Sequence, residues 1–589
     1  MTEATAIRQH QPTKQTASLS YQVAMSQPAS HLFEVTLRVG NWQSDTLDLK
    51  MPVWTPGSYL VREYARHLQD FSATNGSGAA LSSQKLGKNH WQVVTEGVSE
   101  IKVSYRIYAN ELTVRTNHLD STHGYFNGAA LFFLVPGRER QPIELKVIPP
   151  NADWQVTTTL PKTDEPNTFI AKDFDTLVDT PVEIGTQRVY DFEVLGKPHA
   201  LAIWGQGNAN PEQIIADTIR VIETEAEMFG GLPYEHYLFL LHLSGSGYGG
   251  LEHKECCTLN YPRFGFRDRE KYERFIQLVA HEFFHLWNVK RIRPKVLETF
   301  NYEAESYTTS LWFCEGTTSY YDILIPLRAG IYNRQTCLKN LSKDLTKYLN
   351  TSGRKVQPLG ESSYDAWIKL YRRNANSDNN QISYYLKGQF VSLLIDLKIR
   401  AKHNNQRSLD DVMRLMWERF GREEVGFTEK QLRDTIAEVA GDNLDDFFSR
   451  YIETTEELPF NDYFDPFGLY LKTVVESDAP FLGIKVQSQN NKELIQFVIA
   501  ESPAALGGID ANDELLAIDG IRVDAKSLTE RLKDYQPEDT VRVTVFHQDE
   551  LKTLPITLAQ PQSNRYELAI KDNLSQVQQQ NLAGWLGNK

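Results

Sequence analysis

His281-Glu282-Phe283-Phe284-His285 lies within the stretch from Glu270 to Lys290, where apolar residues recur with helical spacing. Residues four apart share one face of a helix, so both imidazoles point the same way and could bind one ion. Zinc accepts imidazole nitrogen and keeps a position for water when only three protein groups hold it. Glu282 follows the first histidine, so its carboxylate could take a proton from that water. Alternatively, the two histidines only pack or face water, and the surrounding sequence has to decide.

A second apolar stretch, from Leu311 to Asp322, supplies the missing carboxylate. Its first acidic residue is Glu315, which follows Trp312, Phe313 and Cys314. Burying this carboxylate without a positive partner would carry a desolvation penalty. A zinc ion held by His281 and His285 would be such a partner, and two His plus one Glu is a catalytic ligand set. Asp322, seven positions further on, could accept the outer N–H of a ligand histidine. It could equally be a polar residue at the end of an aromatic turn.

Size and charge indicate a large protein that does not bind nucleic acid. The 589 residues exceed one hydrophobic core, so roughly three or four domains are expected. The net charge is 62 minus 76, or −14, and the basic residues form no stripe. No apolar run has the length of a membrane span, and we expect no membrane partner.

The ends and the cysteines predict a cytoplasmic protein. Residues 1–17 lack the hydrophobic segment of a secretory signal and are expected to form a disordered lead. The four cysteines, two of them adjacent, do not make a disulfide framework. A leader removed before maturation is the alternative.

Changes of periodicity predict a multidomain α+β chain. Alternating strands over residues 18–205 favour an antiparallel β-sandwich. Residues 206–463 have mainly the helical period, with a buried strand near 237–243 that precedes the helix of His281 and His285. The expected helices span residues 214–229, 270–290, 310–325, 381–402, 409–420 and 428–440. Strands return over residues 464–560, and the Gln-rich residues 561–589 form a polar tail that Trp585 could dock.

Two segments together resemble a known family. HEFFHLWNVKRIRP from His281, followed by SLWFCEGTTSYYDIL from Ser310, is similar to the PDZ-bearing glycyl aminopeptidases, which are gluzincin zinc metallopeptidases. The resemblance implies a thermolysin-like, mainly helical catalytic domain over residues 206–463. The 29 residues between His285 and Glu315 fit this branch, although many aminopeptidases of the clan have a shorter gap. Residues 51–64 resemble the family's N-terminal domain, and their Pro-Gly loop is either a rigid turn or reaches the active-site edge.

Two further motifs carry the resemblance into the substrate site. Gly249-Gly250-Leu251-Glu252-His253 resembles the G-x-M-E-N edge strand, whose Glu pairs with the substrate's amino group; Leu and His depart from that pattern. An exposed glycine-rich loop is the alternative. Ser383 to Gly388 resembles the Y-x-K-G segment, which implies Tyr385 as the oxyanion donor, or Tyr384 if the register shifts by one. Either tyrosine could instead belong to the core.

The C-terminal strands resemble a PDZ domain. Ser502-Pro503-Ala504 and the turn near Asp519-Gly520 carry the similarity. In such domains a loop like Phe481–Ile484 offers backbone N–H groups to a peptide C-terminus, or the domain only packs on its neighbour.

These observations predict a zinc aminopeptidase whose substrate is a peptide with a free N-terminus. His281, His285 and Glu315 would hold Zn²⁺, Glu282 and Tyr385 would catalyse, and the resemblance implies small first residues, Gly or Ala. A zinc endopeptidase, or a PDZ-based binding protein on an inactive peptidase scaffold, is the alternative. A leukotriene-type hydrolase on the same zinc site also stays open.

Overall fold

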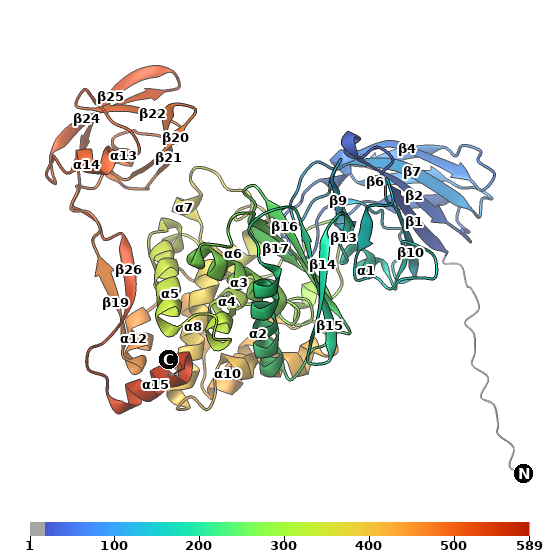
Figure 1. The fold of residues 1–589 in the computed structure, drawn as a ribbon. Coiled ribbons are helices and arrows are strands. Elements are labelled where there is room, and N and C mark those ends of the chain that lie inside the picture. Colours follow the sequence, from blue (N-terminus) through green and yellow to red (C-terminus); the bar gives the residue numbers. More distant parts are fainter. Residues whose placement is uncertain (1–17, 588–589) are drawn as a thin grey trace, which may run out of the picture.

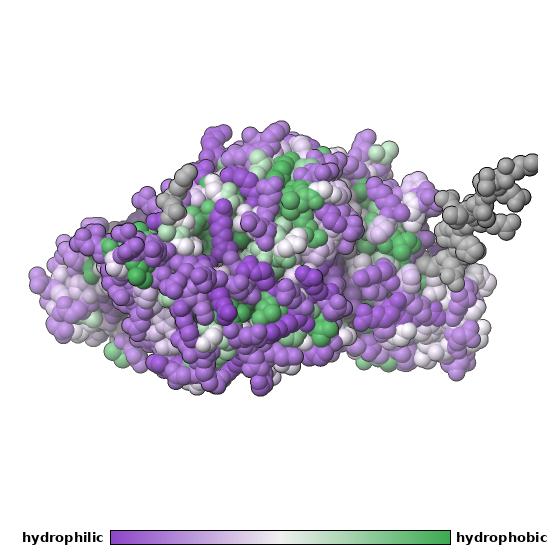
Figure 2. All heavy atoms as spheres, turned by 90° about the horizontal axis from the view of Figure 1, so that it is seen from below, coloured by the Kyte–Doolittle hydropathy of each residue, from purple (hydrophilic) through white to green (hydrophobic). Residues whose placement is uncertain are grey.

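The computed structural model describes residues 18–587, which form a β-rich N-terminal domain, a largely helical middle domain and a small C-terminal β-domain (Figure 1). The lead predicted for residues 1–17 lies outside the described residues. Each of the three parts has its own buried apolar cluster. The face of the molecule in Figure 2 is mostly hydrophilic, with apolar groups in small separate patches. No helix within residues 18–587 is long and apolar enough to cross a bilayer.

The N-terminal domain contains three sheets with strand orders β12-β10-β1-β2-β7-β4, β11-β13-β9-β8 and β3-β6-β5. Apolar residues alternate inward along the strands, as in β2, because successive side chains point to opposite faces. The expectation of an antiparallel sandwich fails at one place, since β1 pairs with β10 in parallel. The elements are β1 (Leu19–Ala24), β2 (Leu32–Val39), β3 (Thr46–Lys50), β4 (Leu68–Asn75), β5 (Ser83–Gly87), β6 (His90–Val94), β7 (Ile101–Tyr108), β8 (His118–Asp120), β9 (His123–Phe126), β10 (Ile143–Ile148), β11 (Gln155–Thr157), β12 (Thr168–Ala171), α1 (Phe174–Val178) and β13 (Val182–Gly185).

The middle domain contains a five-stranded mixed sheet in the order β14-β15-β16-β18-β17. Its strands are β14 (Arg188–Val194), β15 (Lys197–Trp204), β16 (Tyr237–Ser244), β17 (Gly249–Glu252) and β18 (Cys256–Pro262). All eight residues of β16 are buried, as expected for a central strand. The sequence placed the start of this domain at residue 206, but its first strand, β14, begins at Arg188. β17 is an edge strand, so its outer side has no neighbouring strand in this sheet and could receive an extended chain.

Helices pack against this sheet, and all six predicted helices are present. They are α2 (Pro211–Phe229), α3 (Arg269–Phe284), α4 (Thr317–Arg328), α5 (Arg334–Leu349), α6 (Leu359–Tyr364), α7 (Ser377–Asn380), α8 (Tyr384–Lys402), α9 (Leu409–Met416), α10 (Glu429–Ala440), α11 (Asp445–Tyr451) and α12 (Phe460–Phe464). A π-helical turn, η5 (Trp312–Gly316), leads into α4. α3 ends at Phe284 rather than at Lys290, and just beyond it the imidazole of His285 contacts the carbonyl of Asn288 at 2.6 Å.

The C-terminal β-domain is inserted between two paired strands, β19 and β26, which form a stalk on the middle domain (Figure 1). After the domain, the chain returns to the helical core. The predicted docking of Trp585 is confirmed, since it is buried and its indole donates to the Tyr320 hydroxyl at 2.9 Å. The elements are β19 (Leu469–Val474), β20 (Ile484–Gln489), β21 (Lys492–Val498), α13 (Pro503–Leu506), β22 (Glu514–Ile518), β23 (Ile521–Arg522), α14 (Leu528–Leu532), β24 (Thr540–His547), β25 (Glu550–Thr557), β26 (Arg565–Ile570) and α15 (Gln576–Leu586).

Candidate active site

His281, His285 and Glu315 converge, as their spacing predicted. The two histidines lie at the C-terminal end of α3, and Glu315 lies in the π-helical turn η5. Oε2 of Glu315 is 3.1 Å from Nε2 of His285 and 3.6 Å from Nε2 of His281. Turns of this kind occur often at functional sites, because the extra residue redirects a side chain. The arrangement brings three potential ligand atoms to one point.

The outer nitrogens of both imidazoles are occupied. Nδ1 of His281 lies 2.9 Å from Oδ2 of Asp322, and Nδ1 of His285 lies 2.6 Å from the carbonyl of Asn288. A carbonyl only accepts, so Nδ1 of His285 carries a proton, and in the neutral imidazole Nε2 keeps the lone pair that a metal ion would need. The sequence left the role of Asp322 open, and the structure places it beside His281.

Asn288 was not recognised in the sequence. Its amide donates to the carbonyls of Phe313 at 3.0 Å and Cys314 at 3.1 Å, the two residues before Glu315. It therefore joins the end of α3 to the turn that carries Glu315. No local pattern marks this role, because the partners are distant in sequence.

The three side chains fit a tetrahedral metal ion. Bonds of about 2.0–2.1 Å place two ligand atoms roughly 3.3 Å apart, close to the distances found here. Oε2 of Glu315 is buried and has no hydrogen-bond partner. Burial raises the pKa of Glu315, but the adjacent histidines lower it to about 2, so the carboxylate is charged. An ionised carboxylate beside two inward-facing imidazole nitrogens could hold a metal ion.

A second cluster of similar residues differs in geometry. Glu183 lies 2.5 Å from Nε2 of His123 and 2.8 Å from Nε2 of His242. These distances are hydrogen bonds, and they are too short for two ligands of one tetrahedral zinc. Because His242 belongs to β16, the cluster joins the N-terminal domain to the central sheet rather than holding an ion.

Glu282 lies on α3, and its carboxylate points toward the edge strand β17 at Gly250. Its carboxylate lies so close to Gly250 that a Cβ there would be 2.2 Å from Cδ of Glu282, so a larger residue would displace the carboxylate. Oε2 of Glu282 is buried without a partner, and burial raises the pKa of this carboxyl to about 7.

Glu252 is buried at the end of β17, and its Oε1 has no hydrogen-bond partner. One carboxylate oxygen of Glu252, one of Glu282 and one ring nitrogen of His285 all lie within 4.8 Å of one another. The Pro-Gly loop of the N-terminal domain reaches this carboxylate, because a Cβ at Gly57 would be 2.4 Å from Oε1 of Glu252. The sequence left open whether this loop was only a turn.

Tyr385, rather than Tyr384, lines the cleft. Its ring stacks near that of His281, with the centroids 6.2 Å apart, and its hydroxyl lies 2.9 Å from that of Tyr371. Tyr384 is fully buried and donates to the same Tyr371 hydroxyl at 3.3 Å. Tyr371 was missed because it lies in an irregular segment.

The cleft has a volume of about 590 Å³. One wall is the edge strand with Gly249 and Gly250, and the opposite walls are α4, α5 and the start of α8. Residues along it are Arg115, Tyr248, Arg274, Gln277, His281, Glu282, Asp322, Lys343, Tyr371 and Tyr385. An extended chain could therefore lie beside β17 as an added strand.

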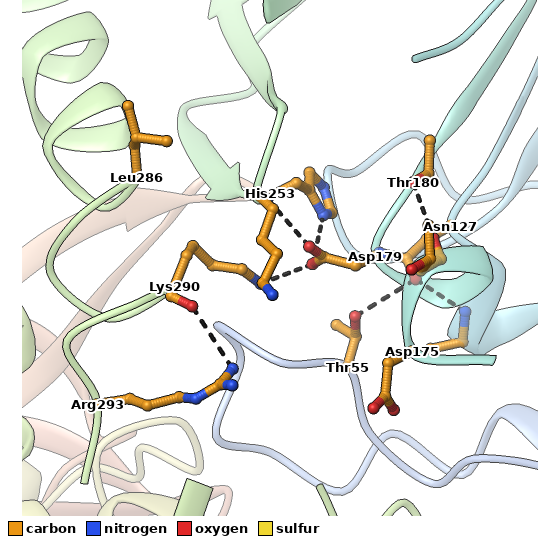
Figure 3. A network of polar contacts seen from close by, with 12 residues as sticks. Thr55, Asn127, Asp175, Asp179, Thr180, His253, Leu286, Lys290 and Arg293 are labelled. Atoms are coloured by element: carbon orange, nitrogen blue, oxygen red, sulfur yellow. Dashed lines mark hydrogen bonds and ion pairs between the residues drawn. The ribbon is translucent and has the colours of Figure 1, made fainter. Parts of the chain in front are cut away.

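The N-terminal domain holds the edge strand through Asp179 (Figure 3). This carboxylate contacts Nδ1 of His253 at 3.2 Å and accepts from Nζ of Lys290 at 2.6 Å and from the backbone of Lys254 at 3.0 Å. Burial opposes ionisation, but Lys290 holds the pKa of Asp179 well below its usual range. His253 follows Glu252 directly and replaces the Asn of the family motif. Its contact with Asp179 therefore connects the end of the edge strand to the N-terminal domain.

Comparisons with known proteins agree with this geometry. Residues 20–186 match the peptidase M61 N-terminal domain, residues 274–391 match the M61 glycyl aminopeptidase family, and residues 480–558 match a PDZ domain. A crystal structure of an aminopeptidase N family protein from Idiomarina loihiensis is 31% identical, with a TM-score of 0.91; the match covers 96% of this chain and 100% of that one.

More distant structures are also similar. An M1 zinc metallopeptidase from Deinococcus radiodurans is 13% identical over 75% of this chain and 94% of its own, with a TM-score of 0.48. No curated protein matches. The resemblance in the sequence is confirmed, and the chain belongs to the M61 glycyl aminopeptidase family, with a PDZ domain near its C-terminus.

Proposed function

We propose that this peptidase is a zinc-dependent aminopeptidase that removes small first residues, Gly or Ala, from peptides. The observation that carries the proposal is the convergence of a possible metal-binding set, the buried carboxylate of Glu282 over Gly250, and the buried carboxylate of Glu252, which has an oxygen within 4.8 Å of Glu282 and His285. The two histidines and Glu315 could bind a metal ion, and the carboxylate of Glu252 could bind the ammonium group at the N-terminus of a peptide.

His281, His285 and Glu315 would hold the zinc, which supplies Lewis acidity that polarises a carbonyl and makes water a better nucleophile. Glu282 takes a proton from the attacking water and delivers it to the departing amine. The hydroxyl of Tyr385 donates to the carbonyl oxygen as negative charge develops on it. Glu252 binds the ammonium group and so fixes which peptide bond lies beside Glu282.

The preference for small first residues rests on family membership, and the N-terminal domain supports it. Gly57 lies against the Glu252 carboxylate, and the next aromatic residue, Tyr59, is buried. The first residue of a substrate bound at Glu252 therefore meets a closed wall on this side.

The test compares the amides of glycyl-alanine and N-acetylglycyl-alanine with wild-type protein and Glu252→Ala. Wild-type protein should cleave only the free amine, and a chelator should abolish the reaction. Glu252→Ala should lose at least about 100-fold in kcat/KM, because a buried charge pair is removed. Cleavage of both amides at equal rates by wild type would favour the endopeptidase. Absence of zinc from the purified protein would favour the binding scaffold.

We further propose that the PDZ loop Phe481–Ile484 receives a peptide C-terminus. Its Gly483 has φ +92, and its carbonyl accepts from the backbone of Ile499. On either side of Ile499, Asn379 of α7 bonds Val498 at 3.0 Å and Ala500 at 2.9 Å, which supports the loop from the catalytic domain. A fluorescent peptide should bind with its free C-terminus and fail to bind as the amide.

A further inference from the structure

Arg115 reaches from the N-terminal domain into the catalytic cleft. It lies between β7 and β8, and its Nη2 donates to the carbonyl of Gly250 at 3.1 Å. A Cβ at Gly249 would be 3.9 Å from its Nη1, so the guanidinium lies over both glycines of the edge strand. Nε is buried and has no hydrogen-bond partner. Four of the five N–H groups of this side chain are thus without a described acceptor.

No carboxylate within residues 18–587 lies at ion-pair distance from Arg115. The acidic groups that act on it, Glu282 and Glu252, are those that the catalytic reaction uses, and Tyr371 and Tyr385 face it across the cleft. Burial lowers the pKa of Arg115, but these four neighbours raise it on balance, so it stays charged. A half-buried guanidinium with unused donors favours a planar anion such as a carboxylate, which it can bind through two parallel bonds.

The length of a dipeptide matches the position of this cation. A peptide held at Glu252 and extended beside β17 advances about 3.3 Å per residue. Its second residue therefore lies roughly beside Gly250 and Gly249, and the α-carboxylate of a dipeptide would end there. A tripeptide would present a neutral carbonyl at the same place and carry its carboxylate past the guanidinium.

We propose that Arg115 binds the α-carboxylate of the departing amino acid, so that the enzyme acts preferentially on free dipeptides. The proposal rests on the aminopeptidase function and adds a specificity-determining residue from the other domain. The ligand class is an unblocked dipeptide with a small first residue. A purely structural alternative is that Arg115 only fixes the edge strand through Gly250.

The deciding quantity is a ratio of kcat/KM, that of glycyl-alanine to that of its amide. The two substrates differ only in the charge of the terminal group, and wild-type enzyme should prefer the acid by about 10- to 100-fold. In Arg115→Gln the ratio should fall to within about threefold of unity, mainly through loss on the acid. Arg274→Gln is the control, because Arg274 also lines the cleft but stacks on Tyr248.

A binding measurement separates recognition from turnover. Calorimetry on the zinc-loaded Glu282→Gln variant should show tighter binding of the acid than of the amide, and the double variant with Arg115→Gln should lose this difference. Equal cleavage of acid and amide by wild type, or an equal loss on both in Arg115→Gln, would overturn the proposal while leaving the aminopeptidase intact. Failure of wild type to cleave either substrate would overturn both.

Discussion

Replacing Gly250 with alanine tests the position of the catalytic carboxylate with a single methyl group. A Cβ at this position would be 2.2 Å from Cδ of Glu282, whereas ordinary contacts begin at 3.4 Å. The carboxylate must therefore retreat by at least 1.2 Å, the difference between these distances. A misplacement of about 1 Å in a catalytic group can cost roughly 100-fold in rate. We expect Gly250→Ala to lose about 100-fold in kcat on glycyl-alanine amide.

Other properties should change little, and this makes the result specific. Gly250 does not have the left-handed backbone that favours glycine, so alanine adds no backbone strain. Zinc content should be unchanged, because Glu282 is not one of the proposed ligands. The thermal midpoint should fall by no more than a few degrees, the effect of about 1 kcal/mol in a large protein.

Gly245→Ala is the matched control, since nothing lies within 4 Å of its Cβ position and it also lacks a left-handed backbone. This variant should keep the kinetic constants of wild type. If Gly250→Ala retained more than a third of wild-type kcat, Glu282 would not act from the position above Gly250, and the assignment of the base would be refuted. If its zinc content fell with its activity, the strand would instead be shaping the metal site.

Four further variants test other contacts of the site and of the junction with the N-terminal domain. Asp322→Asn should weaken zinc binding by about 10- to 100-fold, measured in competition with a chelator. The reason is that the amide would replace the charged acceptor of the His281 Nδ1 proton with a neutral one. Tyr385→Phe should lower kcat by about 100-fold or more, whereas Tyr371→Phe, which removes only its hydrogen-bond partner, should lower kcat by about tenfold with KM unchanged. The pKa of Glu183 is about 2 against an ordinary 4.5, because His123 and His242 offset its burial. Its stabilisation of about 3 kcal/mol is complete above pH 4.5 and is lost as the pH falls toward 2, so wild type should lose thermal stability more steeply there than Glu183→Gln.

The convergence of the proposed metal-binding residues could be predicted because their signal is local. The i, i+4 spacing of His281 and His285 determines their common face, and Glu315 stands out as a carboxylate in an apolar segment. The end of α3 could not be predicted, because it depends on the bonds of Asn288 to a turn far along the chain. Long-range pairing also explains why the membership of β14 and β15 in the sheet of the middle domain could not be predicted. The alternation of their residues predicts strands but not the strands they pair with.

Some missed features did have a signal. Ser575 and Gln578 form a capping box at the start of α15, and this pattern could have predicted a helix in the polar tail. The PDZ insertion between β19 and β26 had no comparable signal, since two short strands separated by a whole domain show no local pairing pattern.

The substrate side of the site belongs to two domains, and this explains why sequence motifs describe it less well than the metal side. Gly57 lies against Glu252, Asp179 bonds His253, and Arg115 bonds Gly250, so three residues of the N-terminal domain hold one edge strand. The metal-binding set needs only α3, η5 and α4. A domain movement that separated the two parts would leave the proposed metal ligands together, but it would remove Gly57, Asp179 and Arg115 from the edge strand where we propose that a short free peptide binds. Under the proposed function, substrate choice would therefore depend on the interface between domains, whereas metal binding would depend on the helical core.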